Sequence, residues 1–360
     1  MKKIINIGKR YIGIGRNDHM RLGFSDVIYS MFDNDSRFDV LLSYLDKSGI
    51  KEVRFGINLV TIKSLNKYGD LSKIIPILKK VQDNDFKIHL YLFLSDDIAN
   101  AGQGKCPKLW RNRTIHSLRT ALADDCSKCV DLLEKNEIII DSYTVGNESE
   151  WGICGFRFYE KISNAGMKGD QDFAFLRNEL WYINAHLIKA CCEVLYEKSS
   201  NSKVIIHSNS IGIKNFTYEY LTFMADAGVP FDLIGLTYCP WTKWDDDYHN
   251  FTKLRDAITK LKKLRKPIWI VEYSYPRNII ENGELTVTSP SDEYYYNDYG
   301  QTNFHLDFLD KCKNMGIDAV FFWRGEHEYK TDFSYKTGIM KDGEIDKRLL
   351  DKLVECQSIQ

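Results

Sequence analysis

Short apolar runs alternate with longer amphipathic stretches along the whole chain. The short runs are rich in β-branched and aromatic residues and predict eight buried strands at 11–15, 52–57, 87–93, 138–145, 203–207, 233–236, 268–272 and 319–323. A three- and four-residue apolar period predicts helices between them at 39–47, 71–82, 111–133, 172–196, 217–226, 251–264 and 302–314, and a last helix at 347–356. This alternation predicts an α/β fold, a (β/α)₈ TIM barrel that forms a single domain over residues 1–360 with extended loops.

Composition and charge exclude two classes of partner. The chain has 360 residues, of which 44% are hydrophobic, with 49 basic and 50 acidic side chains. A nucleic-acid partner is not expected, because phosphate binding needs a concentrated basic surface. A membrane partner is not expected either, because the sequence has no apolar window of about eighteen residues.

The cysteines and the start of the chain predict a reducing, cytoplasmic location. The nine cysteines are an odd number scattered through a large chain, and the sequence has one CxxC pair with no partner pair at zinc-finger spacing. That pair, Cys126 and Cys129, continues the helical period of Leu118, Leu122 and Leu133, which indicates buried thiols. The start, MKKIINIGKRY, lacks the apolar stretch of about seven to fifteen residues that a secretory signal needs.

Polar and aromatic residues gather at the predicted strand ends. In a barrel, the side chains at the C-terminal ends of the strands converge on one mouth. The candidates for this mouth are Arg54, Asp96, Asn147, Glu148, His207, Tyr238, Trp241, Glu272 and Trp323. Structural explanations stay open for two of them, since Arg54 could serve only as an ion-pair partner and His207 only as a hydrogen-bonded core histidine.

The two glutamates at the ends of the predicted fourth and seventh strands are the expected catalytic residues. Glu148 and Glu272 are expected to face each other across the mouth. Retaining glycoside hydrolysis uses two carboxyl groups about 5–5.5 Å apart, one as the nucleophile and one as acid and then base. Arg54 would keep a neighbouring carboxylate ionised, Tyr238 would orient Glu272, and Asn147 would donate a hydrogen bond to the sugar 2-hydroxyl.

The remaining candidates are expected to contact the substrate. Trp241 and Trp323 offer flat apolar surfaces for pyranose rings, while Asp96 and His207 supply polar contacts. The predicted partner is therefore a carbohydrate. This chemistry needs no cofactor, and the sequence leaves any protein partner unknown.

These motifs resemble the clan A glycoside hydrolases, and within them family 53, the arabinogalactan endo-β-1,4-galactanases. The resemblance runs from about Arg54 to Gly343 and rests on VGNE at 145–148, FDLIGLTYCPW at 231–241, PIWIVEYSYP at 267–276, Gly300–Gln301 and VFFW at 320–323, in family order. It implies a retaining, galactanase-like β-glycosidase that acts on a poly- or oligosaccharide, with Glu148 as acid/base and Glu272 as nucleophile.

The sequence departs from the family around the predicted substrate cleft. The third strand ends Phe93-Leu94-Ser95-Asp96 where the family has His-Tyr-Ser-Asp, and Trp323-Arg324-Gly325 stands where it has Trp-Glu-Pro. Both glutamates are unchanged, so the chemistry is better supported than galactan as the substrate. Family members can hold calcium after strand seven, but residues 277–299 lack regular ligand spacing, and no metal is predicted.

Three alternatives stay open because barrels host many functions. The first is another clan A activity, directed at mannan or glucan or acting from a chain end. The second is a catalytically silent barrel that binds glycans. The third is a metal-dependent barrel enzyme that uses His207, Asp96 and Glu326.

Overall fold

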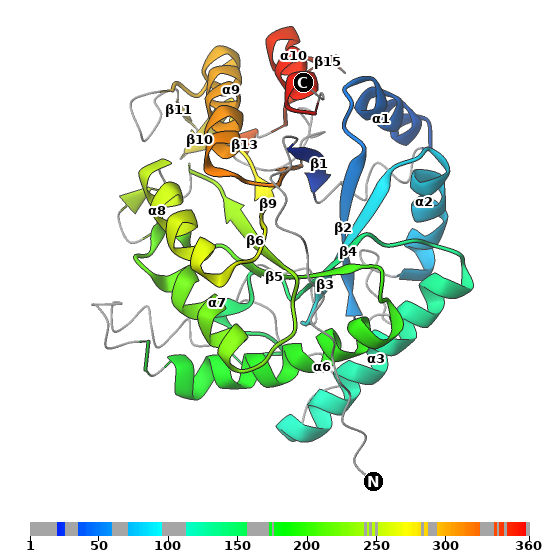
Figure 1. Ribbon diagram of the computed structural model, residues 1–360. Helices are drawn as coiled ribbons and strands as arrows, with labels where there is room; N and C mark the ends of the chain where they lie inside the picture. The colour runs from blue at the N-terminus through cyan, green and yellow to red at the C-terminus, as the bar shows by residue number, and fades with distance from the viewer. Residues whose placement is uncertain are drawn as a thin grey trace.

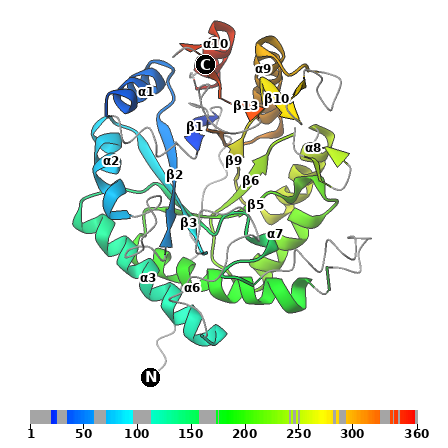
Figure 2. The ribbon, with the colours of Figure 1, turned by 180° about the vertical axis from the view of Figure 1, so that it is seen from behind.

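Eight parallel strands close into a barrel in the computed structural model of the protein, with helices around its outside (Figures 1 and 2). This confirms the predicted fold class. Around the barrel the strands follow the order β1, β12, β9, β6, β5, β4, β3, β2. Their bounds are β1 Arg21–Ser25, β2 Glu52–Asn58, β3 Lys87–Phe93, β4 Ser142–Val145, β5 Lys203–Ser208, β6 Leu233–Tyr238, β9 Ile268–Tyr273 and β12 Ala319–Trp323.

The structure describes residues 20–25, 35–59, 71–95, 113–156, 173–174, 176–240, 243–244, 247–248, 251–281, 284–286, 294–324, 335–336, 338–341 and 344–357. Within these ranges, no helix has both the length and the apolar character that crossing a bilayer requires.

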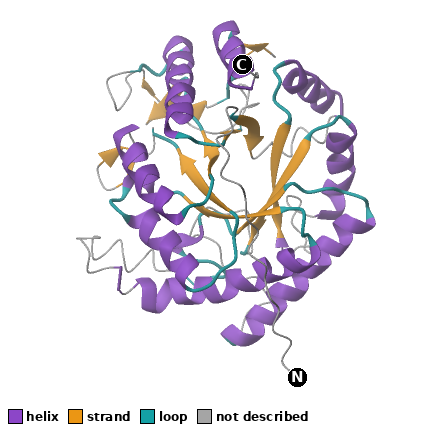
Figure 3. Ribbon diagram, in the orientation of Figure 1, coloured by secondary structure: helices purple, strands orange, loops and turns teal. Residues whose placement is uncertain are grey.

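Helices follow the barrel strands and form the outer layer (Figure 3). The α-helices are α1 Asp35–Lys47, α2 Leu71–Asp83, α3 Ile115–Lys135, α6 Tyr182–Lys198, α7 Phe216–Asp226, α8 Phe251–Leu261, α9 Asp298–Met315 and α10 Lys347–Gln357. Shorter helical segments are η4 Ser149–Trp151, η5 Leu176–Trp181, η6 Ser210–Gly212 and η7 Lys262–Leu264. The expected cysteine stripe is confirmed, because Cys126 and Cys129 on α3 are buried against the barrel layer with their leucine neighbours.

Three small sheets lie outside the barrel. They consist of β7 Lys243–Trp244 with β8 Asp247–Tyr248, β10 Asn278–Glu281 with β11 Glu284–Thr286 and β13 Tyr335–Lys336, and β14 Met340–Lys341 with β15 Glu344–Ile345. All their pairings are antiparallel, unlike those of the barrel.

The first strand is where the sequence prediction failed. Barrel strand β1 is Arg21–Ser25, whereas the predicted run at 11–15 lies outside the described residues. The true strand has no continuous apolar run, because Arg21 and Gly23 interrupt it. Leu22 and Phe24 are its large apolar side chains, and both are buried. Gly23 allows the ring of Phe321 to fill the barrel, since a Cβ there would lie 2.5 Å from that ring.

The inside of the barrel is divided between an apolar plug and a polar lower end. Six buried residues make the plug: Ile205, Leu233, Trp269, Val271, Ala319 and Phe321. At the N-terminal end of the strands, Glu52 accepts a hydrogen bond from Arg21 at 2.5 Å and pairs with His89 at 3.1 Å. The apolar plug and this buried cluster fill the lower part of the barrel, so the opposite, C-terminal mouth is where a ligand can be bound.

Candidate active site

The chain turns sharply where β4 ends. Gly146 has a φ of 77°, and Glu148 itself adopts the left-handed conformation with φ 46° and ψ 51°. A non-glycine residue in this region is uncommon and tends to be held there at functional sites. The turn lets two glutamates that are two positions apart, Glu148 and Glu150, contact different parts of the barrel.

A β-bulge aims Glu272 into the barrel. Between Ile270 and Glu272, β9 advances two residues while its neighbour β6 advances one, and its pairing with β12 shifts in the same place. The extra residue is Val271, which lies in the barrel plug. Without it, strict alternation would turn Glu272 outward, together with Ile270. Bulges of this kind often redirect a side chain beside an active site.

Arg54 holds Glu272 in place. Its Nη1 donates to Glu272 Oε1 at 2.7 Å and to Ser25 Oγ at 2.9 Å, and its guanidinium lies 4.0 Å from the ring centroid of Tyr91. Arg54 is 1% exposed and Glu272 7%. The ion pair is therefore largely shielded from water, and the positive charge favours the ionised carboxylate. The predicted contact between Arg54 and a mouth carboxylate is present in the structure.

Glu148 is held by a chain of side chains from three strand ends. Thr237 Oγ1 donates to Glu148 Oε1 at 2.8 Å and lies 2.8 Å from His207 Nε2. The other ring nitrogen of His207, Nδ1, lies 3.1 Å from Asn147 Oδ1. Burial, reinforced by the charge of Arg54, lowers the pKa of His207 well below its usual value, so its ring is neutral.

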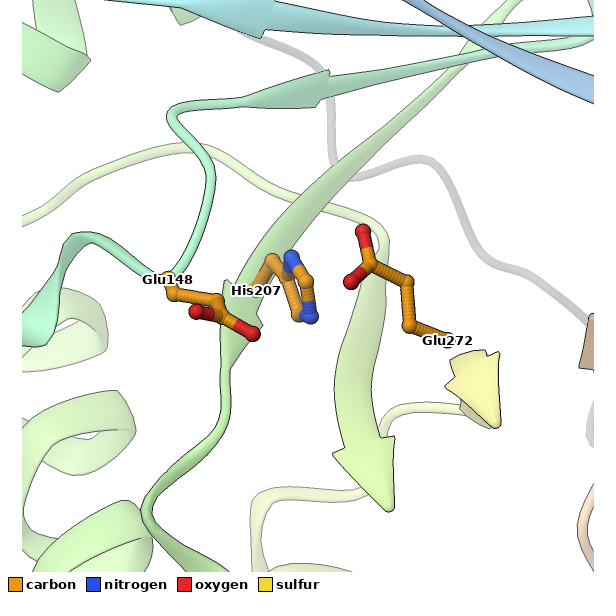
Figure 4. Close-up of side chains that lie close together, drawn as sticks. All are labelled: Glu148, His207 and Glu272. Carbon is orange, nitrogen blue, oxygen red and sulfur yellow. The ribbon is translucent and has the colours of Figure 1, made fainter. Parts of the chain in front are cut away.

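Glu148, His207 and Glu272 lie close together at the barrel mouth (Figure 4). One oxygen of each carboxyl group and one His207 ring nitrogen all lie within 4.8 Å of one another. This spacing would accommodate a metal ion. However, both ring nitrogens of His207 bond to protein side chains and Glu272 is paired with Arg54, so we assign no metal to the cluster.

Glu150 has a structural role and does not face the mouth cluster. It is fully buried, and its Oε1 accepts hydrogen bonds from the hydroxyl of Ser208 and the amide of Asn209, and from both the amide and the hydroxyl of Ser210. Burial raises the pKa of Glu150 in spite of these donors. The residue therefore fixes the segment after β5.

The structure places Tyr238 away from the two glutamates, contrary to the sequence expectation. Its ring stacks on Phe308 of α9 at 5.3 Å between centroids, and on Phe251 of α8 at 6.1 Å. Successive strand residues point to opposite faces. Since Thr237 faces the barrel interior, Tyr238 faces the helices.

The other predicted substrate contacts divide into two groups. Trp323 is half-buried at the end of β12, with Arg324 at 4.6 Å from its ring centroid, and its contact with substrate stays a prediction. Asp96 and Trp241 lie outside the described residues, as do Glu326 and much of the loop considered for calcium.

Sequence reasoning missed Thr237. The signal was present, because Thr237 precedes a bulky aromatic residue at a strand end, and only one of two adjacent residues can face the mouth. Which of the two faces the mouth could not be decided from the sequence. In the structure β6 alternates regularly, so Thr237 lies on the same face as Leu233 of the barrel plug.

Comparisons with known proteins agree on one family. The family model described as glycosyl hydrolase family 53 matches residues 26–351. An endo-β-1,4-galactanase of Bacillus subtilis is 22% identical over 338 residues, covering 90% of this chain and 72% of the relative. The arabinogalactan endo-β-1,4-galactanase A of Emericella nidulans is 21% identical over 309 residues, covering 83% of this chain and 80% of the relative. The solved family 53 catalytic domain of Ignisphaera aggregans shares the fold with a TM-score of 0.72 at 16% identity, over 96% of this chain and 98% of that domain.

The closed barrel and the matching family model define the class as a glycoside hydrolase of the TIM-barrel type. The chain belongs to glycosyl hydrolase family 53, whose model covers most of its length. Its substrate is accordingly a carbohydrate.

Proposed function

We propose that this protein is a retaining endo-β-1,4-galactanase in which Glu148 is the acid/base and Glu272 the nucleophile. The observation that carries the proposal is the pair of carboxylates, whose nearest oxygens lie within 4.8 Å. Retaining glycosidases have carboxyl groups about 5–5.5 Å apart, whereas inverting enzymes leave about 6.5–9.5 Å for a water molecule. Galactan is proposed because the similar Bacillus and Emericella proteins are named as galactanases.

The surroundings of the two carboxylates suit different roles. Glu272 is paired with the guanidinium of Arg54, which favours the charged form that a nucleophile needs. Glu148 accepts a hydrogen bond from the neutral hydroxyl of Thr237. A buried carboxyl group that is hydrogen-bonded to a hydroxyl can hold and release a proton, as an acid/base must.

The reaction follows from this division. Glu272 attacks the anomeric carbon while Glu148 protonates the oxygen of the leaving sugar, which gives a glycosyl ester on Glu272. Glu148, now ionised, removes a proton from water as that water attacks the same carbon. The ester bond breaks, the sugar is released with its original configuration, and both carboxyl groups return to their starting states.

Hydrolysis of β-1,4-galactan and a panel of aryl β-glycosides tests the proposal, with wild type compared with Glu272→Gln. We expect galactan cleavage to mixed oligosaccharides, and its loss in the variant. An activated 2-fluoro sugar should label wild type on the peptide that contains Glu272. Labelling of another residue, or variant activity within tenfold of wild type, contradicts the mechanism. If only mannan, glucan or short glycosides are cleaved, the mechanism stands and galactan is not the substrate.

A further inference from the structure

Two buried side chains hold the backbone that follows Glu148. Asn184, in the first turn of α6, donates from Nδ2 to the carbonyl oxygen of Ser149 at 2.7 Å. Trp181, the last residue of η5, donates from Nε1 to the carbonyl oxygen of Glu150 at 3.1 Å. Neither side chain is exposed. Because residues three apart on a helix are neighbours, one helix face fixes both peptide carbonyls that follow Glu148.

Ser149 is bound from three directions. Besides the amide of Asn184, its carbonyl oxygen accepts the backbone N–H of Gly152 at 3.1 Å, so both lone pairs of that oxygen are used. Its hydroxyl lies 2.8 Å from the hydroxyl of Tyr220 on α7. Ser149 itself is fully buried. The peptide groups on the C-terminal side of Glu148 therefore have little freedom to rotate.

This restraint matters because Glu148 has an unfavourable backbone conformation. Its φ of 46° and ψ of 51° lie in the left-handed region, where the Cβ atom of a non-glycine residue crowds the following carbonyl oxygen. Such a conformation persists only where the surrounding contacts over-determine it. The bonds to Ser149 and Glu150 are contacts of this kind, since rotation of Glu148 to a favoured conformation would redirect the chain after it and break them.

Core packing does not account for Asn184. Its Oδ1 is buried and accepts no hydrogen bond from the residues that the structure describes. An unpaired buried acceptor costs stability that an apolar side chain of the same size would avoid. The next buried residues of α6 are apolar: Ala185, Leu187, Ile188 and Ala190. The bond from Nδ2 to Ser149 is therefore the contribution that explains an amide at this position.

The turn directs the carboxyl group of Glu148 into the barrel mouth. Its Oε1 accepts from Thr237 at 2.8 Å, and one of its oxygens lies within 4.8 Å of a carboxylate oxygen of Glu272 (Figure 4). A general acid works only within hydrogen-bond reach of the atom that it protonates. A change in the backbone of Glu148 would move the carboxyl group from this place, and displacement of a catalytic group by about 1 Å can cost about 10²-fold in rate.

We infer that Asn184 and Trp181 are positioning residues for the reaction, which hold Glu148 in its left-handed conformation and thereby aim its carboxyl group at the leaving oxygen. The inference rests on the proposed function, in which Glu148 protonates that oxygen. Because both side chains are buried against the turn, they act through its backbone and do not touch the sugar. Trp181 ends η5, which is a π-helix, and π-helices are rare and occur often at functional sites.

The test compares aryl β-galactobiosides whose leaving groups range from 2,4-dinitrophenol to phenol. Asn184→Leu removes the donor and keeps the volume of the side chain. We expect kcat/KM for the phenyl substrate to fall by about 10- to 100-fold, as for a misplaced catalytic group. The dinitrophenyl substrate, whose leaving group needs no proton, should change by no more than about threefold. A uniform loss, or no loss, overturns the inference when Glu148→Gln itself shows this dependence.

Trp181→Phe is the second variant. It removes the Nε1 donor and keeps an aromatic ring in the core. Because Asn184 still holds Ser149 in this variant, we expect the same dependence on the leaving group with a smaller amplitude. Trp181→Phe decides the question if Asn184→Leu does not fold.

Ser202→Ala is the matched control. Ser202 is buried, and its hydroxyl donates to the carbonyl oxygen of Ile140 at 2.6 Å, just before β4 begins at the opposite end of the barrel. The variant therefore also loses a buried bond to the backbone, and it should lower the free energy of unfolding without changing the dependence on the leaving group. The same dependence in Ser202→Ala would assign the effect to lost stability and overturn the inference.

A double variant shows whether Asn184 acts through Glu148. In the Glu148→Gln background, Asn184→Leu should cause little further loss of kcat/KM on the phenyl substrate, because no acid remains to be positioned. If the two losses multiply, Asn184 acts on something other than Glu148, and the inference is wrong.

Crystal structures of wild type and Asn184→Leu separate this inference from the proposed function. We expect Glu148 to leave the left-handed region in the variant and to lose its bond to Thr237. If Glu148 keeps both, the inference is overturned whatever the activity. If Glu148 moves and yet Glu148→Gln shows no dependence on the leaving group, Asn184 still positions Glu148, but Glu148 is not the acid/base.

Discussion

Glu148 and Glu150 are two residues apart, but their carboxylates bind different partners. Glu148 accepts from Thr237 at the barrel mouth, whereas Glu150 accepts four hydrogen bonds from residues 208–210 after β5. The left-handed backbone at Glu148 separates the two side chains. The chain thus contains a matched pair of glutamates in one short segment, one facing the proposed reaction and one fixing a loop.

Substitution of the two glutamates should give opposite results. We expect Glu148→Gln to lower galactan hydrolysis by about 10²- to 10⁴-fold, the usual contribution of a general acid/base. The loss should be smaller on an aryl glycoside whose leaving group needs no proton. Glu150→Gln keeps the accepting Oε1 and should retain activity within about threefold, because the amide is nearly isosteric. Comparable losses in both variants would count against Glu148 as the acid/base.

Arg54 offers a second prediction, because its charge is buried beside Glu272. A lysine cannot reproduce the planar contact with Tyr91 while it bonds both Ser25 and Glu272. We expect Arg54→Lys to lower kcat/KM by at least about 100-fold and to destabilise the fold by about 3 kcal/mol, as for other disrupted buried pairs. The acid limb of the pH profile should move to higher pH, since a lysine ammonium that lacks these contacts is held less closely to Glu272 than the guanidinium.

The control for Arg54 is the arginine at the other end of the barrel. Arg21 bonds Glu52 and lies 4.7 Å from the ring centroid of Trp269, away from the mouth. Arg21→Lys should lower the free energy of unfolding and leave the pH profile of kcat/KM unchanged. A shift of the acid limb in this variant as well would assign the Arg54 effect to general loss of stability.

The barrel could be predicted from the sequence because its strands are buried on both faces. Seven of the eight strands coincide with runs predicted from apolar patterning, from Glu52–Asn58 to Ala319–Trp323. The first strand was missed because two of its five residues, Arg21 and Gly23, break the pattern. Their role depends on Glu52 and Phe321, which are distant in sequence, so local patterning could not identify the strand.

The site was predicted in part for a similar reason. Glu148 and Glu272 stand at strand ends, and the alternation of strand and helix was enough to bring them to one mouth. The inward direction of Glu272 depends on the extra residue Val271 in β9, and a bulge has no local sequence signature here. The order of strands and helices could therefore be predicted from the sequence. The face to which each side chain beside the bulge points depends on the three-dimensional pairing of the strands, which the sequence does not show.

Gly300 gives a stability prediction that is opposite to what helix propensity alone would suggest. It lies in the first turn of α9, and a Cβ there would lie 2.1 Å from the carbonyl oxygen of Tyr295. The next residue, Gln301, donates to the carbonyl oxygen of Tyr275 at 2.7 Å, just beyond the strand of Glu272. Although alanine is favoured over glycine in helices by about 1 kcal/mol, we expect Gly300→Ala to destabilise the protein by about 3 kcal/mol through overpacking against backbone.

Chemical denaturation of Gly300→Ala and of a control in the same helix measures this effect. Asn314→Ala lies on the exposed side of α9 near its end and should change the free energy of unfolding by no more than about 0.5 kcal/mol. If Gly300→Ala proves as stable as wild type, the backbone of Tyr295 is free to move, and the glycine is not required for close approach.

His305 on α9 should make the protein sensitive to acid. It is fully buried, and its Nδ1 lies 2.6 Å from the hydroxyl of Tyr273. Burial lowers the pKa of His305 from 6.5 to about 3. The unfolded chain therefore binds a proton that the folded chain rejects, so the stability due to neutral His305 is complete above pH 6.5 and is lost as the pH falls towards 3.

Replacement of His305 by glutamine removes this proton linkage while keeping a group that can accept from Tyr273. Within the window from pH 6.5 to about 3, the free energy of unfolding of wild type should fall more steeply than that of His305→Gln, by about 1.4 kcal/mol per pH unit. Urea denaturation at about pH 7.5, 5.5 and 4.5, which lie on either side of the usual histidine pKa, would measure the two slopes. His116→Gln, at an exposed position of α3, is the control for removing a histidine outside the core. Parallel pH dependences for wild type and His305→Gln would show that His305 is protonated in the folded protein without cost.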